Sequence, residues 1–173
     1  MAYMLQSDYH GRIMPQTTIG IIGGTGLYEL PGLTEMRQVS VDTPFGSPSS
    51  LVTEGLLNGV RLLFIARHGE GHVYLPSEVP YRANIFALKM LGAQWCLSIS
   101  AVGSLKEEFA PGDLVLPHQF IDRTKKRTDT FFGNGICAHV PFAAPVCPVM
   151  HQELCHAAKE SAAEKSVRVH SAA

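Results

Sequence analysis

Short apolar runs in this chain stop directly at residues suited to hold an anion, and this pattern constrains the fold more than any other feature. The run Thr18–Ile22 meets the glycine-rich turn GGTG at 23–26, and Val60–Ala66 meets Arg67 and His68. A third run, WCLSIS at 95–100, continues into small residues. Apolar runs of this length that are rich in β-branched residues and end at glycine or polar residues predict β-strands.

A helix is predicted between the second and third runs. Pro80 precedes the stretch Tyr81–Leu91, in which Ile85, Leu88 and Leu91 recur at helical spacing, and Gly92 stands where a helix C-cap glycine belongs. Further strand is expected at Leu114–Leu116 with Phe120–Ile121, a second helix at His151–Glu164, and a strand at Ser166–His170, after a long polar connection over 122–148. Strands that alternate with helices predict an α/β fold with a largely parallel or mixed central sheet flanked by helices.

Composition excludes several classes of protein. Of the 173 residues, 46% are hydrophobic and the net charge is −1, which argues against a disordered chain and against a basic nucleic-acid-binding face. No segment approaches the roughly 20 apolar residues of a membrane span, and residues 1–16 read as a flexible polar tail without a signal peptide. A cytoplasmic location is therefore expected. The four cysteines form no CxxC pair, so neither a zinc site nor any other metal site is expected.

The candidate site residues are those that follow the predicted strands, because ligands of open α/β sheets bind beyond the carboxyl ends of the strands. Thr25 in the glycine-rich turn, Arg67 and His68, and Ser100 with Ala101 would supply hydroxyl, guanidinium, imidazole and backbone N–H donors. Each group also has a plain structural interpretation: a tight turn, a surface arginine beside a loop histidine, and a close-packed strand exit. No GxSxG elbow is present, and no protein nucleophile is indicated; a site that positions phosphate as the nucleophile fits better.

The motifs taken in order resemble one known family. The runs IGIIGGTGLYEL, VDTPFGSPS, ARHGEGH, LPSEVPYRANIFALKMLG and SISAVGSLKEEFAPGDLVLPHQFIDRT are similar to those of the 5'-methylthioadenosine phosphorylases, which belong to the trimeric purine-nucleoside phosphorylases. The resemblance covers about residues 18–160. It implies a nucleoside-phosphorylase-like fold, with residues 17–173 as the N-terminal portion of a single phosphorylase domain.

The resemblance also implies an activity: phosphorolysis of 5'-methylthioadenosine to adenine and 5-methylthioribose 1-phosphate, with inorganic phosphate as co-substrate and without a cofactor. By similarity, the phosphate is bound by Thr25, Arg67, His68, Ser100 and Ala101; the family often has threonine at the position of Ser100. The resemblance further implies a homotrimer, in which His139 reaches the pocket of the neighbouring subunit. No catalytic side chain is carried over beyond these binding residues.

The chain departs from the family at its end. The family continues with an MEGP-like and a TDYD-like segment, which line the sugar and purine site, and neither is present, so we expect a C-terminally truncated chain. Base specificity therefore stays open. The alternatives are a phosphorylase of the same family that acts on 5'-methylthioinosine or other purine nucleosides, and a fragment or anion-binding module without turnover.

Overall fold

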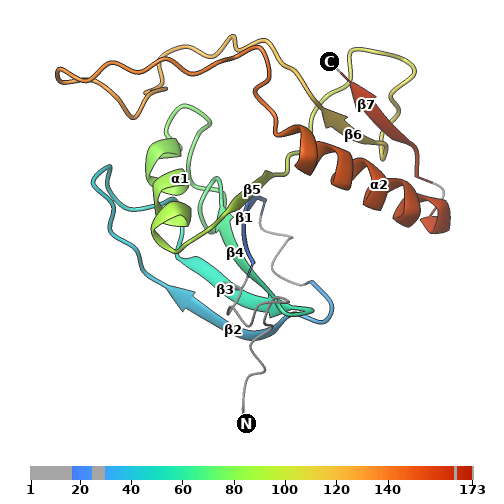
Figure 1. Ribbon diagram of the computed structural model, residues 1–173, viewed down its shortest axis with the longest axis horizontal. Helices are drawn as coiled ribbons and strands as arrows, with labels where there is room; N and C mark the ends of the chain where they lie inside the picture. The colour runs from blue at the N-terminus through green and yellow to red at the C-terminus, as the bar shows by residue number, and fades with distance from the viewer. Residues whose placement is uncertain (1–16, 25–29, 166, 173) are drawn as a thin grey trace, which may run out of the picture. The chain divides into compact units, whose positions relative to one another are not determined.

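The computed structural model describes residues 17–24, 30–165 and 167–172, which form two compact units (Figure 1). The first unit comprises the described residues up to Ser100 together with Lys126–Phe131. The second comprises Ala101–Lys125 and the described residues from Phe132 onward. Residues 1–16, predicted to be a flexible tail, lie outside the described residues. The assignment of 17–173 to a single domain stays a prediction.

The first unit contains a mixed five-stranded sheet in the order β2-β3-β4-β1-β5. β1 pairs in parallel with β4 on one side and with β5 on the other, whereas β3 pairs antiparallel with β2 and β4. The strands are β1 (Thr18–Gly23), β2 (Thr34–Val39), β3 (Val52–Leu57), β4 (Val60–Ala66) and β5 (Trp95–Ser98). The α/β class with a parallel or mixed sheet is confirmed.

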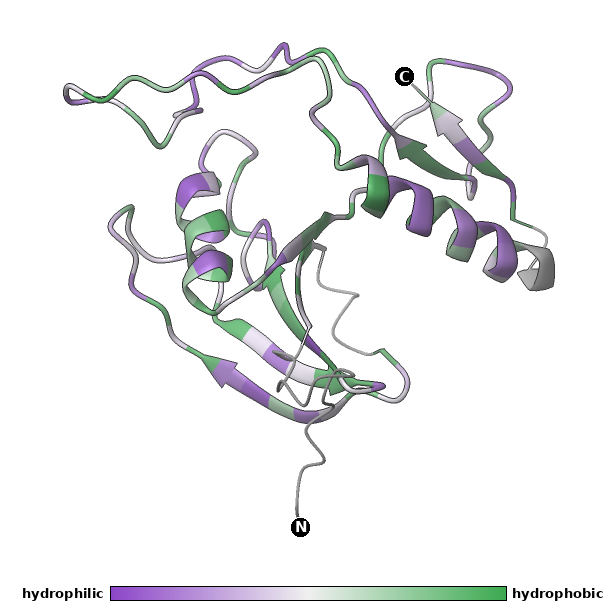
Figure 2. Ribbon diagram, viewed as in Figure 1, coloured by the Kyte–Doolittle hydropathy of each residue, from purple (hydrophilic) through white to green (hydrophobic). Residues whose placement is uncertain are grey.

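Two of these strands were not predicted. β2 is polar and almost wholly exposed, so it carries no apolar alternation, and Figure 2 colours it largely hydrophilic, whereas β4 is largely hydrophobic. β3 and β4 are joined by Asn58 and Gly59, both at positive φ (48° and 80°). Asn-Gly at positive φ is the preferred two-residue turn of a β-hairpin, so the pair Asn58-Gly59 in the sequence could have predicted the hairpin of β3 and β4.

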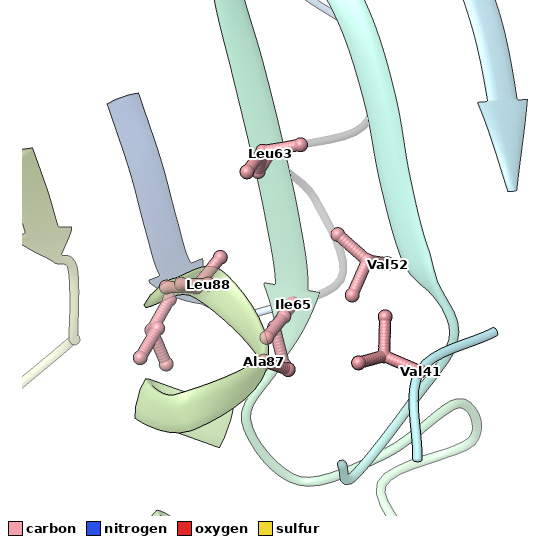
Figure 3. Close-up of a cluster of buried hydrophobic side chains, with 7 residues drawn as sticks. Val41, Val52, Leu63, Ile65, Ala87 and Leu88 are labelled. Carbon is pink, nitrogen blue, oxygen red and sulfur yellow. The ribbon is translucent and has the colours of Figure 1, made fainter. Parts of the chain in front are cut away.

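The core lies on both faces of β4, because its side chains alternate between the two faces of the sheet. Leu62 and Phe64 pack with Ile21 of β1 on one face. The opposite face packs against the helix α1 (Tyr81–Met90). Figure 3 shows that second cluster, which consists of Ile22, Val41, Val52, Leu63, Ile65, Ala87 and Leu88.

Helix α1 ends as predicted. Gly92 has φ 87°, and its N–H donates to the Lys89 carbonyl (3.1 Å), while the Ala93 N–H donates to the Leu88 carbonyl (2.9 Å). The helix can approach β1 closely because position 20 is a glycine: a Cβ there would lie 2.6 Å from Leu88 Cδ1. The buried face of α1 and the small residue of β1 together fix the helix on the sheet.

The second unit is built from β6 (Leu114–Pro117), α2 (Pro148–Lys165) and β7 (Val169–Ala172), with β6 and β7 paired in parallel. Asp113 accepts hydrogen bonds from Arg168 Nη2 (3.0 Å) and pairs with His170 Nε2 (2.9 Å), which ties the start of β6 to β7. These contacts join segments that are far apart in sequence.

Several predicted bounds were wrong. Phe120–Ile121 lies outside any strand, β5 ends at Ser98, α2 begins at Pro148, and β7 begins at Val169; Ser166 is outside the described residues. Among the described residues no strand pairs with Phe120 or Ile121, and apolar side chains alone do not form a ladder. The connection predicted over 122–148 is a loop up to α2, with an isolated bridge between Gly133 and Ile136. No helix in the described part of the chain is long and apolar enough to cross a membrane.

A pH dependence of stability follows from a carboxylate shared by two arginines. Glu54 accepts hydrogen bonds from Arg61 (2.8 Å) and Arg37 (2.9 Å). The hydrogen bond from Arg61 is the main cause that lowers the pKa of Glu54 below its ordinary value of 4.5. Since the folded pKa is lowered, the pairs stabilise the folded chain above pH 4.5, and this contribution is lost as the pH falls through the folded value.

We therefore expect the free energy of unfolding of the wild-type chain to approach that of Glu54→Gln as the pH is lowered below that range, because the glutamine cannot titrate. Urea unfolding of both proteins over a pH series measures the difference. A difference that stays constant from neutral pH through this acidic window would contradict the assignment.

Candidate functional site

The candidate site lies where the parallel strands β4, β1 and β5 end side by side. Gly23 of β1 is paired with Ala66 of β4, and Ile22 with Ser98 of β5. Hydrogen bonds continue past the strands: the Arg67 N–H donates to the Gly23 carbonyl (2.9 Å) and the Ile99 N–H to the Ile22 carbonyl (2.9 Å). The residues that follow these strands are therefore held at one edge of the sheet, as predicted.

Arg67 contacts two of the other predicted site residues. Its Nη1 donates a hydrogen bond to the Ser100 hydroxyl, although the two residues are 33 positions apart, and its Nε donates to His68 Nε2 (3.2 Å). Within the described residues Arg67 forms no salt bridge, so its positive charge is not neutralised by a carboxylate there. The half-buried guanidinium, a ring nitrogen and a hydroxyl thus converge on one place, which is an arrangement suited to an anion.

Three residues from outside the motif, Ser49, Ser50 and Asn84, hold the backbone just before Arg67. The Ser49 hydroxyl donates to the Ala66 carbonyl (2.6 Å), and the Ala66 N–H donates to the Ser50 hydroxyl (3.0 Å). Asn84 of α1 accepts the Ser49 N–H on its Oδ1 (2.8 Å). Sequence reasoning missed these residues, because nothing in a serine pair within a turn-rich loop indicates which distant backbone it contacts.

The loop after β4 turns back on itself at a glycine. Gly69 has φ 75°, and its N–H donates to the Ala66 carbonyl (3.0 Å). A Cβ at this position would lie 2.9 Å from Val73 Cγ2 and 3.1 Å from the Ser49 carbonyl oxygen. Glycine is therefore required by both the conformation and the space, and the turn sets the direction in which His68 points.

The roles of the other three predicted residues stay predictions. Thr25 lies outside the described residues. Ala101 follows Ser100 directly in the chain and belongs to the second unit. His139 is exposed in the loop before α2, with its Nε2 3.9 Å from Cys137 Sγ. In the described ranges no group of three or more His, Cys, Asp or Glu side chains could hold a metal ion.

The chain belongs to the phosphorylase superfamily, whose family model matches residues 18–173. Within it, the chain is 53% identical over 149 residues to S-methyl-5'-thioadenosine phosphorylase of Geobacter sulfurreducens, a match that covers 86% of this chain and 52% of that protein. The corresponding phosphorylase of Gloeobacter violaceus is 52% identical over 148 residues, covering 86% of this chain and 48% of its own. The predicted resemblance is confirmed.

Solved structures show the same fold. A methylthioadenosine phosphorylase from an antarctic soil metagenomic library superposes with a TM-score of 0.86 at 49% identity, covering 91% of this chain and 55% of that one. Methylthioadenosine phosphorylase from Schistosoma mansoni in complex with adenine gives a TM-score of 0.78 at 40% identity, with 84% and 55% covered. The chain spans about half the length of the relatives it matches.

The contact between Asn84 and Ser49 makes a testable prediction. Asn84 is 1% exposed, and its replacement by alanine leaves the buried Ser49 N–H without an acceptor. We expect Asn84→Ala to lower the free energy of unfolding by about 1–3 kcal/mol, the usual cost of an unsatisfied buried polar group. Urea denaturation measures it, with Gln38→Ala, which removes an exposed amide side chain on β2, as the control. An equal, small effect of both substitutions would contradict the prediction.

Proposed function

We propose that this chain forms the phosphate-binding part of a purine-nucleoside phosphorylase, with Arg67, His68 and Ser100 as phosphate ligands and, by resemblance to the family, Thr25 and Ala101 as further ones. The observation that supports the proposal is the convergence of Arg67, His68 and Ser100 at the carboxyl ends of neighbouring parallel strands. An arginine that forms no salt bridge with any residue in the described part of the chain, placed beside a hydroxyl, suits a tetrahedral oxyanion.

The proposed reaction is the phosphorolysis of S-methyl-5'-thioadenosine, the substrate in the names of the relatives. A phosphate oxygen forms a bond to the anomeric carbon of the sugar, and the bond from that carbon to the purine nitrogen breaks. The leaving base takes up a proton from solvent to become adenine, and this is balanced by the proton that the bound hydrogen phosphate releases to solvent once it is esterified. The product is 5-methylthioribose 1-phosphate. Phosphate is the nucleophile, so the chain's own groups act by holding it in line and by stabilising its charge.

We further propose an oligomeric state and a cellular location. The resemblance supports a homotrimer in the cytoplasm, in which His139 of one subunit contacts the substrate of its neighbour. No cofactor is proposed, and phosphate is the co-substrate. His139 lies on an exposed loop, which is consistent with a contact outside its own subunit.

A second candidate function is anion binding without turnover. The observation that favours it is that the contacts among Arg67, His68 and Ser100 account for the binding of an anion and do not by themselves provide for a purine. The two candidates predict the same affinity for phosphate and differ only in the release of base.

The deciding experiment measures free base released by the purified chain from 5'-methylthioadenosine, 5'-methylthioinosine and inosine, each with and without phosphate. Phosphate-dependent release from the first substrate supports the proposed reaction, and release from another substrate assigns the base specificity instead. Phosphate binding without release supports the second candidate. If phosphate neither binds nor promotes release, both candidates are wrong.

A further inference from the structure

The hydrogen-bond partners of His68 determine which of its ring nitrogens carries the proton. Nδ1 lies 2.8 Å from the Tyr74 carbonyl oxygen, which can only accept a hydrogen bond, so Nδ1 is the donor. Nε2 lies 3.2 Å from Nε of Arg67, which can only donate, so Nε2 presents its lone pair. The two contacts agree on a neutral ring protonated at Nδ1.

The loop around His68 keeps the ring in this orientation. The Tyr74 N–H donates to the His68 carbonyl (3.0 Å), so His68 and Tyr74 are joined by two hydrogen bonds across the turn at Gly69. The ring of His72 stacks on that of His68, with centroids 4.4 Å apart and planes at 20°. A ring flip would break the bond to Tyr74 and point Nδ1 elsewhere, so Nε2 is the nitrogen that remains for a ligand.

We propose that His68 binds phosphate as a hydrogen-bond acceptor, and that the site thereby selects an oxyanion that carries a hydroxyl group. This inference rests on the proposed phosphate site. The phosphate hydroxyl donates to the lone pair on His68 Nε2, and the Nε–H of Arg67 that occupied this lone pair turns to a deprotonated phosphate oxygen. Each donor and each acceptor then keeps a partner, and no proton is transferred.

This arrangement orients the nucleophile. The protonated oxygen of phosphate faces His68, whereas the deprotonated oxygens face Arg67 and Ser100, so a negatively charged oxygen is the one available to attack. Sulfate has the same tetrahedral shape and, at mildly alkaline pH, the same double negative charge, but it carries no hydroxyl. Its oxygens would meet the lone pair of Nε2 directly, and a site built to accept a hydrogen bond discriminates against an analogue that cannot donate one.

The test compares the dissociation constants of inorganic phosphate and sulfate for the chain at mildly alkaline pH by isothermal titration calorimetry. We expect phosphate to bind at least about tenfold more tightly than sulfate, as the loss of one hydrogen bond implies. His68→Gln places an amide that can donate near the position of Nε2, so this variant should lose the preference. His156→Gln, the same substitution at an exposed histidine of α2, is the matched control and should keep it.

A second measurement needs no variant. A long-range 1H–15N correlation spectrum of the wild-type chain reports the tautomer of each histidine, and the His68 signals should show a proton on Nδ1. Equal affinity for the two anions, or a proton found on Nε2, would overturn the inference while leaving the proposed phosphate site in place. Failure of both anions to bind would contradict the proposed function itself, and the inference with it.

Discussion

Arg67→Ala should weaken the binding of inorganic phosphate by about 1.5–3 kcal/mol, or roughly 10- to 150-fold in the dissociation constant, the usual value for hydrogen bonds to a charged group. Arg67 is half-buried and forms no salt bridge with any described residue, so its charge and its remaining N–H groups are available to an anion. Titration calorimetry with phosphate measures the change. Arg67→Lys should give part of the loss, because lysine keeps the charge but not the planar fork of donors.

The matched control is Arg37→Ala. It removes the same charge from the same unit, but Arg37 lies on β2 with its side chain 67% exposed and paired with Glu54. We expect phosphate affinity to be almost unchanged in this variant, because exposed charges at a distance are screened by salt. If both alanine variants weakened binding equally, phosphate would be attracted by the overall charge and not bound at Arg67.

Leu63→Ala should lower the free energy of unfolding by about 2–5 kcal/mol, as expected when a large buried side chain leaves a cavity. Leu63 is fully buried on β4, in the cluster between the sheet and α1 that Figure 3 shows. The same strand leads into Arg67, so we also expect weaker phosphate binding near the midpoint of unfolding. Urea denaturation followed by circular dichroism measures the stability.

Leu75→Ala is the control for this substitution, since the Leu75 side chain is 62% exposed in the loop before α1. A change within about 0.5 kcal/mol is expected there. Similar effects of the two substitutions would mean that the packing around Leu63 does not carry the stability of the first unit.

The parts of the fold that sequence reasoning predicted are those that carry a local signal. The strand over Val60–Ala66 was recognised because five of its residues are buried, which requires a continuous apolar run. The helix end at Gly92 was recognised because a C-cap needs a residue that tolerates positive φ. β2 was missed because an exposed edge strand is held by backbone hydrogen bonds to β3, and its side chains TEMRQV carry no pattern.

The residues of the candidate site also fall into those that the sequence predicted and those that it did not. Arg67, His68 and Ser100 were identified as a group because the carboxyl ends of parallel strands meet, which is a rule about topology that a sequence can satisfy. The supporting contacts of Ser49 with Ala66 and Asn84 were not identified. They join residues that are 17 and 35 positions apart, and no local pattern specifies such a pair.

The amino-acid sequence by itself determined the family, the α/β class and the kinds of group that follow β1, β4 and β5, because these depend on residue type and on order along the chain. Only the tertiary structure decided that Arg67 reaches the Ser100 hydroxyl and that Tyr74 takes the Nδ1 proton of His68. The physical reason is that a donor or acceptor acquires its role from the partner placed opposite it. That placement is made by strand pairing and by the turn at Gly69, across distances that the local sequence does not encode.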